Sequence, residues 1–184
     1  MKELLSGNEA IARGAYEAGV NVATGYPGTP STEILEAAVR FLDDIYCQWS
    51  PNEKVALEVA AGAAFTGARA IATMKHVGLN GAANPLMTLA GTGTVGGLAI
   101  VVAVDPGMHS SQNEQDTRHY ARFARIPILE PSDSQEAKDF VSLGLELSER
   151  HRTPVILRTE TRVSHSRGLV DLSDRKPSGK AIGF

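Results

Sequence analysis

The order of apolar and polar positions along the chain predicts helices that alternate with short apolar strands. This alternation is typical of a doubly wound α/β domain, with a mainly parallel sheet of about six strands and helices on both faces. The clearest strand is the uninterrupted apolar run Leu98–Val104, which is typical of a strand buried on both faces. The other expected strands cover residues 21–25, 45–49, 70–74, 126–129 and 155–158.

Helix start signals fall between these strands. Ser6 and Glu9 have the spacing of a capping box, which starts a first helix. Later helices are expected to begin at Pro30 or Ser31, at Asn52 and Glu53, at Thr117, and at Ser132 or Ser134, with a weaker helix over residues 80–89. From Asp171 onward the chain turns polar. We therefore expect one domain over residues 1–172 and a polar tail or linker over residues 173–184.

Composition and charge exclude several classes of function. A length of 184 residues suits one domain with a sizeable core. The net charge is −3 and no basic block is present, so no nucleic-acid partner is expected. Cys47 is the only cysteine, which rules out an internal disulfide framework and an iron–sulfur cluster held by this chain alone.

No membrane or export signal is expected. The first seven residues are too short for a signal peptide and lead into a polar helix start. Residues 77–104 carry no charge, but they contain Pro85 and six glycines, so they are interpreted as helix, loop and buried strand. These observations favour a cytoplasmic protein.

Ligands of doubly wound sheets bind in the loops that follow the carboxyl ends of the strands. The first such loop, residues 26–33, contains Gly28, Thr29 and Ser31. Gly28 permits close backbone approach, the hydroxyls can face a ligand, and the helix behind offers free N–H groups to an anion. The alternative is plain helix initiation, with Thr29 or Ser31 as the cap and Pro30 as the first helical residue.

Two further loops carry charged or titratable side chains. Lys75 and His76 end an otherwise uncharged strand, where they offer a cation and a titratable donor or acceptor; the alternative is an ordinary surface loop. Arg118 follows a long polar loop and has the chemistry of a clamp for a substrate carboxylate; the alternative is a solvated surface charge. His109, Asp116 and His119 in the same stretch match no established metal pattern, so no metal site is expected.

The glycine motif of residues 91–96 lacks the surroundings of a dinucleotide-binding loop. Residues 91–96 match G-x-G-x-x-G, but a helix precedes them and the strongest strand follows, so they are not a dinucleotide fingerprint.

The helix that begins at Asn52 carries Glu53 in its first turn and then consists mostly of Ala and Gly, which allows a flat ring to approach closely. A carboxyl beside such an apolar wall can act as a hydrogen-bonding acid. The alternative is a capped core helix with a solvated glutamate.

Four segments, in this order, carry a resemblance to a known family: residues 7–15, 26–33, 52–56 and 111–118. Over residues 1–172 the chain resembles the pyrimidine-binding domain of the thiamine-diphosphate-dependent 2-oxoacid:ferredoxin oxidoreductases, and within them the amino-terminal domain of the indolepyruvate branch. The resemblance implies an α/β pyrimidine domain. It also implies oxidative decarboxylation of a 2-oxo acid, an arylpyruvate such as indolepyruvate, to an acyl-CoA.

The resemblance also implies roles for individual residues. The family's glutamate lies nine residues ahead of a G-A-x-x-x-G-A element, which residues 62–68 match, so Glu53 is the expected catalytic contact to N1′ of the aminopyrimidine. A carboxyl bonded to N1′ favours the imino tautomer, whose nitrogen takes the thiazolium C2 proton. Gly28, Lys75 and His76 are the further expected cofactor contacts. Thr29 and Arg118 are expected near the substrate.

The family's motif for holding the diphosphate and its magnesium is missing from this sequence. We therefore expect half of an active site. Thiamine diphosphate would be shared with a diphosphate-binding domain or subunit, and magnesium and iron–sulfur clusters would come only through partner domains. Coenzyme A, a beta subunit and ferredoxin are the other expected partners, in a homo- or hetero-oligomer assembled through the small-residue helix of residues 52–68. The alternative is a non-catalytic α/β binding or assembly module with this fold.

Overall fold

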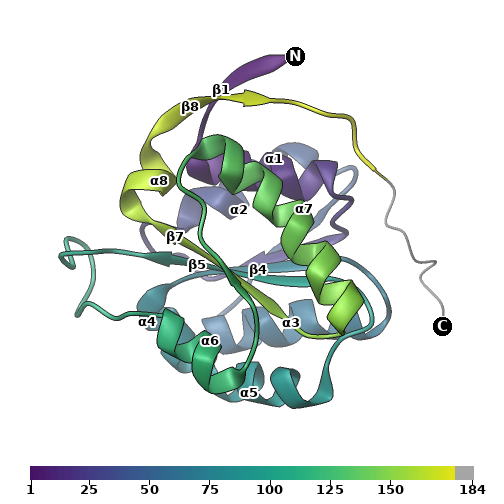
Figure 1. The fold of residues 1–184 in the computed structure, drawn as a ribbon, viewed down its shortest axis with the longest axis vertical. Helices are drawn as coiled ribbons and strands as arrows, with labels where there is room; N and C mark the ends of the chain where they lie inside the picture. The colour runs from purple at the N-terminus through teal and green to yellow at the C-terminus, as the bar shows by residue number, and fades with distance from the viewer. Residues whose placement is uncertain (177–184) are drawn as a thin grey trace.

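The structure, a computed structural model, describes residues 1–176. Six parallel strands form the central sheet, in the order β3-β2-β4-β5-β7-β6 (Figure 1). The strands are β2 (Val22–Gly25), β3 (Tyr46–Trp49), β4 (Ala70–Lys75), β5 (Leu98–Val104), β6 (Ile128–Leu129) and β7 (Val155–Glu160). β5 has the predicted bounds and is buried along its whole length. The predicted doubly wound α/β fold is thereby confirmed.

Helices cover both faces of the sheet, and each face has its own apolar core (Figure 1). One layer contains α1 (Gly7–Glu17), α2 (Thr32–Ala38) with the 3-10 helix η1 (Val39–Phe41), and α7 (Ser134–His151). The other contains α3 (Glu53–Phe65), α4 (His76–Gly81), α5 (Ala83–Thr92) and α6 (Arg118–Ala124). The Ser6 capping box is present, because the Ser6 hydroxyl accepts from the Glu9 N–H and the Glu9 carboxylate accepts from the Ser6 N–H.

Three elements were missed by the sequence pattern. β1 (Lys2–Ser6) pairs antiparallel with β8 (Arg167–Asp171) in a separate two-stranded sheet, and the short α8 (Thr161–His165) leads into β8. β1 and β8 lie at opposite ends of the described chain, so no local signal announces their pairing. In addition, the single weak helix expected over residues 80–89 is two helices, α4 and α5, which meet at Ala82.

The segment after β8 packs against α1. The N–H of Ser173 donates to Glu17 Oε1 at 2.8 Å, and the Arg175 guanidinium donates to the Tyr16 and Val20 carbonyls. Residues 173–176 therefore contact the domain. The predicted boundary at residue 172 stays a prediction, and the rest of the predicted tail, residues 177–184, lies outside the described residues.

The small-residue side of α3 is internal. Ala56, Ala60 and Ala64 are fully buried in the core beneath the sheet. The expectation that this Ala-rich face of the helix meets a partner is wrong, because the domain's own strands and α5 already cover it. Within residues 1–176, no helix is both long enough and apolar enough to cross a membrane. The uncharged stretch 77–104 contains most of α4, all of α5 and the buried strand β5, whereas one helix and one strand were predicted.

Candidate functional site

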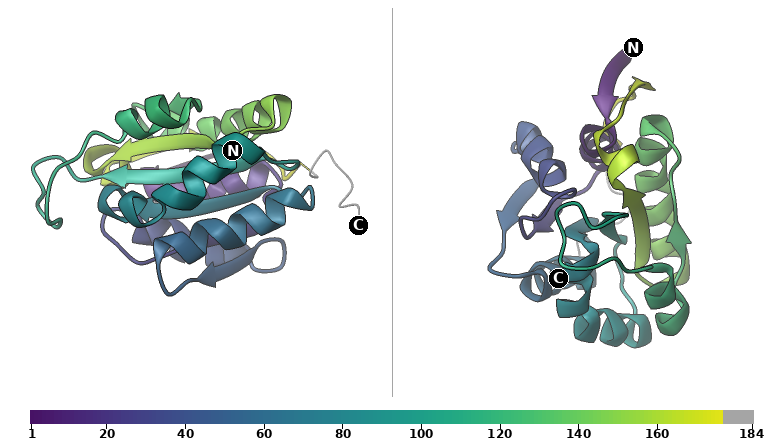
Figure 2. Two further views of the ribbon diagram at one scale, coloured as in Figure 1. Left: turned by 90° about the horizontal axis from the view of Figure 1, so that it is seen from below. Right: turned by 90° about the vertical axis from the view of Figure 1, so that its left-hand side faces the viewer.

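The candidate site lies where the sheet changes winding direction. β2 has β3 on one side and β4 on the other, so the chain runs outward from β2 to β3 and then returns to β4. The carboxyl ends of the two strands at such a switch point are the usual ligand crevice of an open α/β sheet. Gly28 follows β2, Lys75 ends β4, and His76 begins α4. The long loop between β5 and α6 projects from the same edge (Figure 2).

Glu53 is placed by the first turn of α3. Asn52 is the predicted N-cap, since its Oδ1 accepts from the Val55 N–H at 2.9 Å. The Thr24 hydroxyl of β2 donates to the Ala56 carbonyl at 2.7 Å, which ties this turn to the switch-point strand. The half-buried Glu53 side chain lies against the Gly78 backbone of α4. Its carboxylate has no hydrogen-bond or ion-pair partner in residues 1–176, so both oxygens are free to bond an incoming group.

Gly28 and Lys75 are brought together. A methyl group built on Gly28 would lie 2.8 Å from Lys75 Cδ, so a larger residue here would displace the lysine side chain from its present path. The Lys75 ammonium donates to the Ser110 carbonyl at 2.7 Å. Lys75 thus joins the loop after β2 to the loop after β5.

The loop before α2 makes hydrogen bonds within itself, and the anion site expected at the start of this helix stays a prediction. The Gly28 N–H already donates to the Thr32 hydroxyl at 2.8 Å. Ser31 occupies the N-cap position, but its hydroxyl donates backward to the Gly28 carbonyl at 2.7 Å and makes no capping bond. The peptide bond between Thr29 and Pro30 is cis, and the Thr29 side chain is exposed beside the loop.

His76 is fully buried and is no surface-loop residue. Its Nε2 lies 2.9 Å from the Asn113 carbonyl oxygen, and because a carbonyl only accepts, Nε2 carries the proton. His76 Nδ1 is buried and has no partner in the described chain. His76 therefore anchors the loop that follows β5.

Asp105, at the end of β5, organises the near part of that loop. Its buried carboxylate accepts from the Ser110 N–H at 2.8 Å and from the hydroxyls of Ser111 and Thr161. Burial alone would raise the pKa of Asp105, but these hydrogen bonds outweigh it and hold the pKa below its ordinary value. Asp105 stays ionised and fixes the carbonyl of Ser110 where Lys75 reaches it.

Arg118 belongs to a different cluster. Its exposed guanidinium makes a bidentate pair with Glu130, at 2.6 and 2.9 Å, and also pairs with Asp116 at 3.3 Å. The hydrogen bond from Arg118, aided by Arg158, lowers the pKa of Glu130. The structure records no contact between Arg118 and Glu53, Gly28, Lys75 or His76. That Arg118 clamps a substrate carboxylate stays a prediction, and such a clamp would first have to release Glu130.

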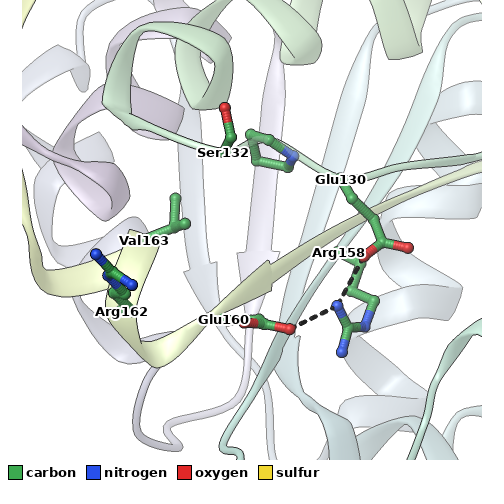
Figure 3. A pocket seen from close by; sticks show the side chains of 7 residues that line it. Glu130, Ser132, Arg158, Glu160, Arg162 and Val163 are labelled. Atoms are coloured by element: carbon green, nitrogen blue, oxygen red, sulfur yellow. Dashed lines mark hydrogen bonds and ion pairs between the residues drawn. The ribbon is translucent and has the colours of Figure 1, made fainter.

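A polar cavity of about 480 Å³ lies beside this second cluster (Figure 3). In it, the buried Arg158 points toward Glu130 and Glu160 and pairs with both, at 2.8 and 3.1 Å. The lining residues are Glu130, Pro131, Ser132, Arg158, Glu160, Arg162 and Val163. The cavity lies at the ends of β6 and β7, and Glu53, Gly28, Lys75 and His76 do not line it.

The sequence analysis missed the residues that hold the site together. Gly78 leaves room for the Glu53 side chain, Asp105 accepts hydrogen bonds from the loop after β5, and the Asn113 carbonyl accepts a hydrogen bond from His76. An aspartate at a strand end before Pro-Gly and two serines is a turn signal that could have identified Asp105. Gly78 and Asn113 carry no such signal, because their partners are distant in the sequence. No group of three or more His, Cys, Asp or Glu side chains within residues 1–176 could hold a metal ion.

Known proteins match this chain over nearly its whole length. The family model described as "Pyruvate flavodoxin/ferredoxin oxidoreductase, thiamine diP-bdg" matches residues 13–182. The indolepyruvate oxidoreductase subunits IorA of Archaeoglobus fulgidus and Methanothermobacter marburgensis are 56% and 53% identical, over 93% and 94% of this chain. The chain spans only 28% of the length of each. The 2-oxoglutarate synthase subunit KorA of Methanothermobacter thermautotrophicus is 31% identical over 97% of the chain and 50% of its own length.

A solved structure supports the fold. A chain of the 2-oxoglutarate:ferredoxin oxidoreductase from Magnetococcus marinus, with 2-oxoglutarate, coenzyme A and succinyl-CoA bound, superposes with a TM-score of 0.81 at 19% identity. The superposition covers 95% of this chain and 33% of that one. The resemblance inferred from the sequence motifs is confirmed: the chain belongs to the pyruvate flavodoxin/ferredoxin oxidoreductase family and corresponds to its thiamine-diphosphate-binding domain.

Proposed function

We propose that this chain supplies the pyrimidine side of the thiamine diphosphate site in a 2-oxoacid:ferredoxin oxidoreductase. The substrate is an arylpyruvate such as indolepyruvate, and the product is the acyl-CoA formed by oxidative decarboxylation. The observation that carries the proposal is the Glu53 carboxylate, which is half-buried and unpaired beside the switch point of the sheet. The names of the IorA relatives support the choice of substrate.

The residues present fit the pyrimidine end of the cofactor. A carboxylate without an internal partner can bond a ring nitrogen, and Gly78 leaves it a cradle that any larger residue would fill. When bound, thiamine diphosphate supplies a nucleophilic carbon that adds to the 2-oxo group. Glu53 holds or moves the proton at N1′, while Gly28, Lys75 and His76 shape the loops around it. Thr29 is exposed in the loop that follows β2, and the proposal gives its hydroxyl a contact with the substrate.

The other half of the site comes from partners. The chain spans 28% of the IorA relatives, so the segments beyond it are the source we propose for the diphosphate-binding domain. Magnesium and iron–sulfur clusters enter only through that domain, the beta subunit and ferredoxin. The assembly is accordingly a hetero-oligomer, in which the Ala-rich face of α3 takes no part because it is buried.

Reconstitution tests the proposal. The chain is co-purified from its source cell, its bound chains are identified, and the recovered complex is assayed for ferredoxin reduction. We expect reduction that depends on indolepyruvate, on coenzyme A and on thiamine diphosphate together. A complex that holds all the missing parts but reduces no ferredoxin with any 2-oxo acid would instead identify a non-catalytic assembly module.

A further inference from the structure

Steric contact with the backbone of α4 restricts the position of the Glu53 side chain. No hydrogen bond or ion pair within residues 1–176 fixes its carboxylate, yet the side chain lies at van der Waals distance from α4. The three atoms nearest to a methyl group built on Gly78 all belong to Glu53: Cγ and Cδ at 2.6 Å, and Oε1 closer still. Real side-chain carbons do not approach this closely, so any residue but glycine at position 78 would displace the carboxylate.

The second glycine of α4 completes this surface. Gly81 lies three residues after Gly78, on the same side of the helix, and a methyl group on it would lie 4.0 Å from Glu53 Oε2. Gly78 is buried and Gly81 is exposed. Glu53 therefore runs along a bare strip of α4 backbone, with one oxygen toward each glycine. Glycine is costly inside a helix, so two glycines in a six-residue helix call for a reason such as this one.

We propose that Gly78 is the positioning residue of Glu53, setting where the carboxylate faces the switch point without taking either of its oxygens. This inference rests on the proposed function for its consequence in catalysis. The contact between Gly78 and the Glu53 side chain lies within this chain, so its effect on stability can be measured without cofactor. Holding the acid by contact instead of by hydrogen bonding leaves its full hydrogen-bonding capacity for the pyrimidine ring.

A double-mutant cycle on the 184-residue chain tests the steric part. Urea unfolding is measured for Gly78→Ala, Glu53→Ala and the double variant. Gly78→Ala should be less favourable to stability in the wild-type chain than in the Glu53→Ala background, because only in the wild type must the Glu53 side chain move aside. Gly91→Ala is the matched control, because a methyl group there meets nothing within 4 Å, and it should not destabilise the chain. If Gly78→Ala alone does not fold, recovery of folding in the double variant supports the inference, and failure to recover overturns it.

Hydrogen–deuterium exchange at C2 of thiamine diphosphate, measured in the reconstituted complex, tests the consequence. Gly78→Ala should slow exchange by up to about 10²-fold, the loss that a misplacement of about 1 Å can cause. In a Glu53→Asp background, where the shorter side chain withdraws from α4, Gly78→Ala should have no further effect. The inference is overturned if Gly78→Ala has the same effect on unfolding with and without Glu53→Ala, and the same effect on exchange with and without Glu53→Asp. Exchange unchanged by Glu53→Gln, with the unfolding coupling intact, overturns the proposed function and leaves the positioning contact supported.

Discussion

His76 at the start of α4 donates from Nε2 to the Asn113 carbonyl at 2.9 Å, and so ties the end of β4 to the loop beyond β5. The imidazole is fully buried, whereas Asn113 is exposed. One internal side chain at the end of β4 thus fixes a surface loop that follows the neighbouring strand β5. Lys75, the preceding residue, makes the same connection at Ser110, so two consecutive residues anchor two points of the loop.

Loss of this anchor should loosen the loop. His76→Phe fills the buried space but removes the donor to the Asn113 carbonyl, and loss of this one hydrogen bond should cost about 0.5–1.5 kcal/mol of unfolding free energy. We expect faster proteolytic cleavage between residues 106 and 116, read by mass spectrometry of the fragments. His76→Gln retains an N–H donor and is the milder control. Equal cleavage of wild type and His76→Phe would show that the loop is held by Asp105 and Lys75 alone.

Replacement of Glu53 should abolish proton transfer and leave the fold intact. Glu53→Gln keeps the size of the side chain but cannot exchange a proton, and general acid–base groups typically contribute ~10²–10⁴-fold to rate. In the reconstituted complex, exchange at the thiazolium C2 should slow by that factor, with an unchanged unfolding midpoint. Glu58→Gln is the matched control, since Glu58 is exposed on the same helix and pairs with Lys54 at 3.8 Å. An effect confined to Glu58→Gln would move the catalytic role to that residue.

The isolated chain should bind thiamine diphosphate poorly. Only the pyrimidine end finds a candidate partner here, and residues 1–176 hold no cluster suited to the magnesium of the diphosphate. Isothermal titration calorimetry with magnesium present should show no binding in the sub-micromolar range. Addition of the diphosphate-binding partner should bring the affinity into that range. Sub-micromolar binding by the chain alone would refute the half-site arrangement.

The sequence predicted the sheet well because each strand of the sheet carries its own signal. The run Leu98–Val104 is apolar throughout, and Asn52 and Ser6 announce their helices by local capping. The antiparallel pair β1–β8 has no such signal, since Lys2–Ser6 and Arg167–Asp171 each need the other to be a strand. The same limit applies within the site: Glu53 was found from its place on a helix, but its neighbour Gly78 is a product of tertiary packing.

A charge on the buried side of α3 should unfold the domain. Ala60 is fully buried, so Ala60→Glu places a carboxylate in an apolar core without a partner. Such a change ranks with the most destabilising single substitutions, at more than about 4 kcal/mol, and circular dichroism should show loss of the cooperative thermal transition. Gly62→Glu is the control on the same helix, because position 62 is exposed and open, and it should fold normally. A folded Ala60→Glu variant with altered assembly would restore the partner-facing interpretation of this helix.

The ion pair between Glu17 of α1 and Lys138 of α7 should make stability depend on pH. The two buried side chains meet at 2.8 Å, and Arg13 also donates to Glu17 at 2.7 Å. Burial opposes ionisation of Glu17, but the hydrogen bonds from Lys138, Arg13 and the Ser173 N–H outweigh it and lower its pKa below the ordinary 4.5. Burial likewise opposes the charge of Lys138, yet the bond to Glu17 raises its pKa above 10.5.

Proton linkage gives the direction in which each pKa shift makes the unfolding free energy change with pH. Between the lowered folded pKa of Glu17 and 4.5 the unfolded chain binds more protons, so this contribution is complete above pH 4.5 and is lost as pH falls through the folded value. The contribution of Lys138 is complete below pH 10.5 and is lost as pH rises from there through the raised pKa of the folded state. Lys138→Met leaves the buried Glu17 with Arg13 and the Ser173 N–H as its remaining partners, which should cost about 3–5 kcal/mol at pH 7. Because the pKa of Glu17 is then less depressed, the unfolding free energy measured with urea from pH 3 to pH 7 should fall less steeply toward acid pH than in the wild type.

The Glu17→Gln/Lys138→Met variant removes both charges and should regain part of the stability at pH 7. An identical acid profile for wild type and Lys138→Met would show that Arg13 and the Ser173 N–H hold Glu17 in its ionised form without Lys138.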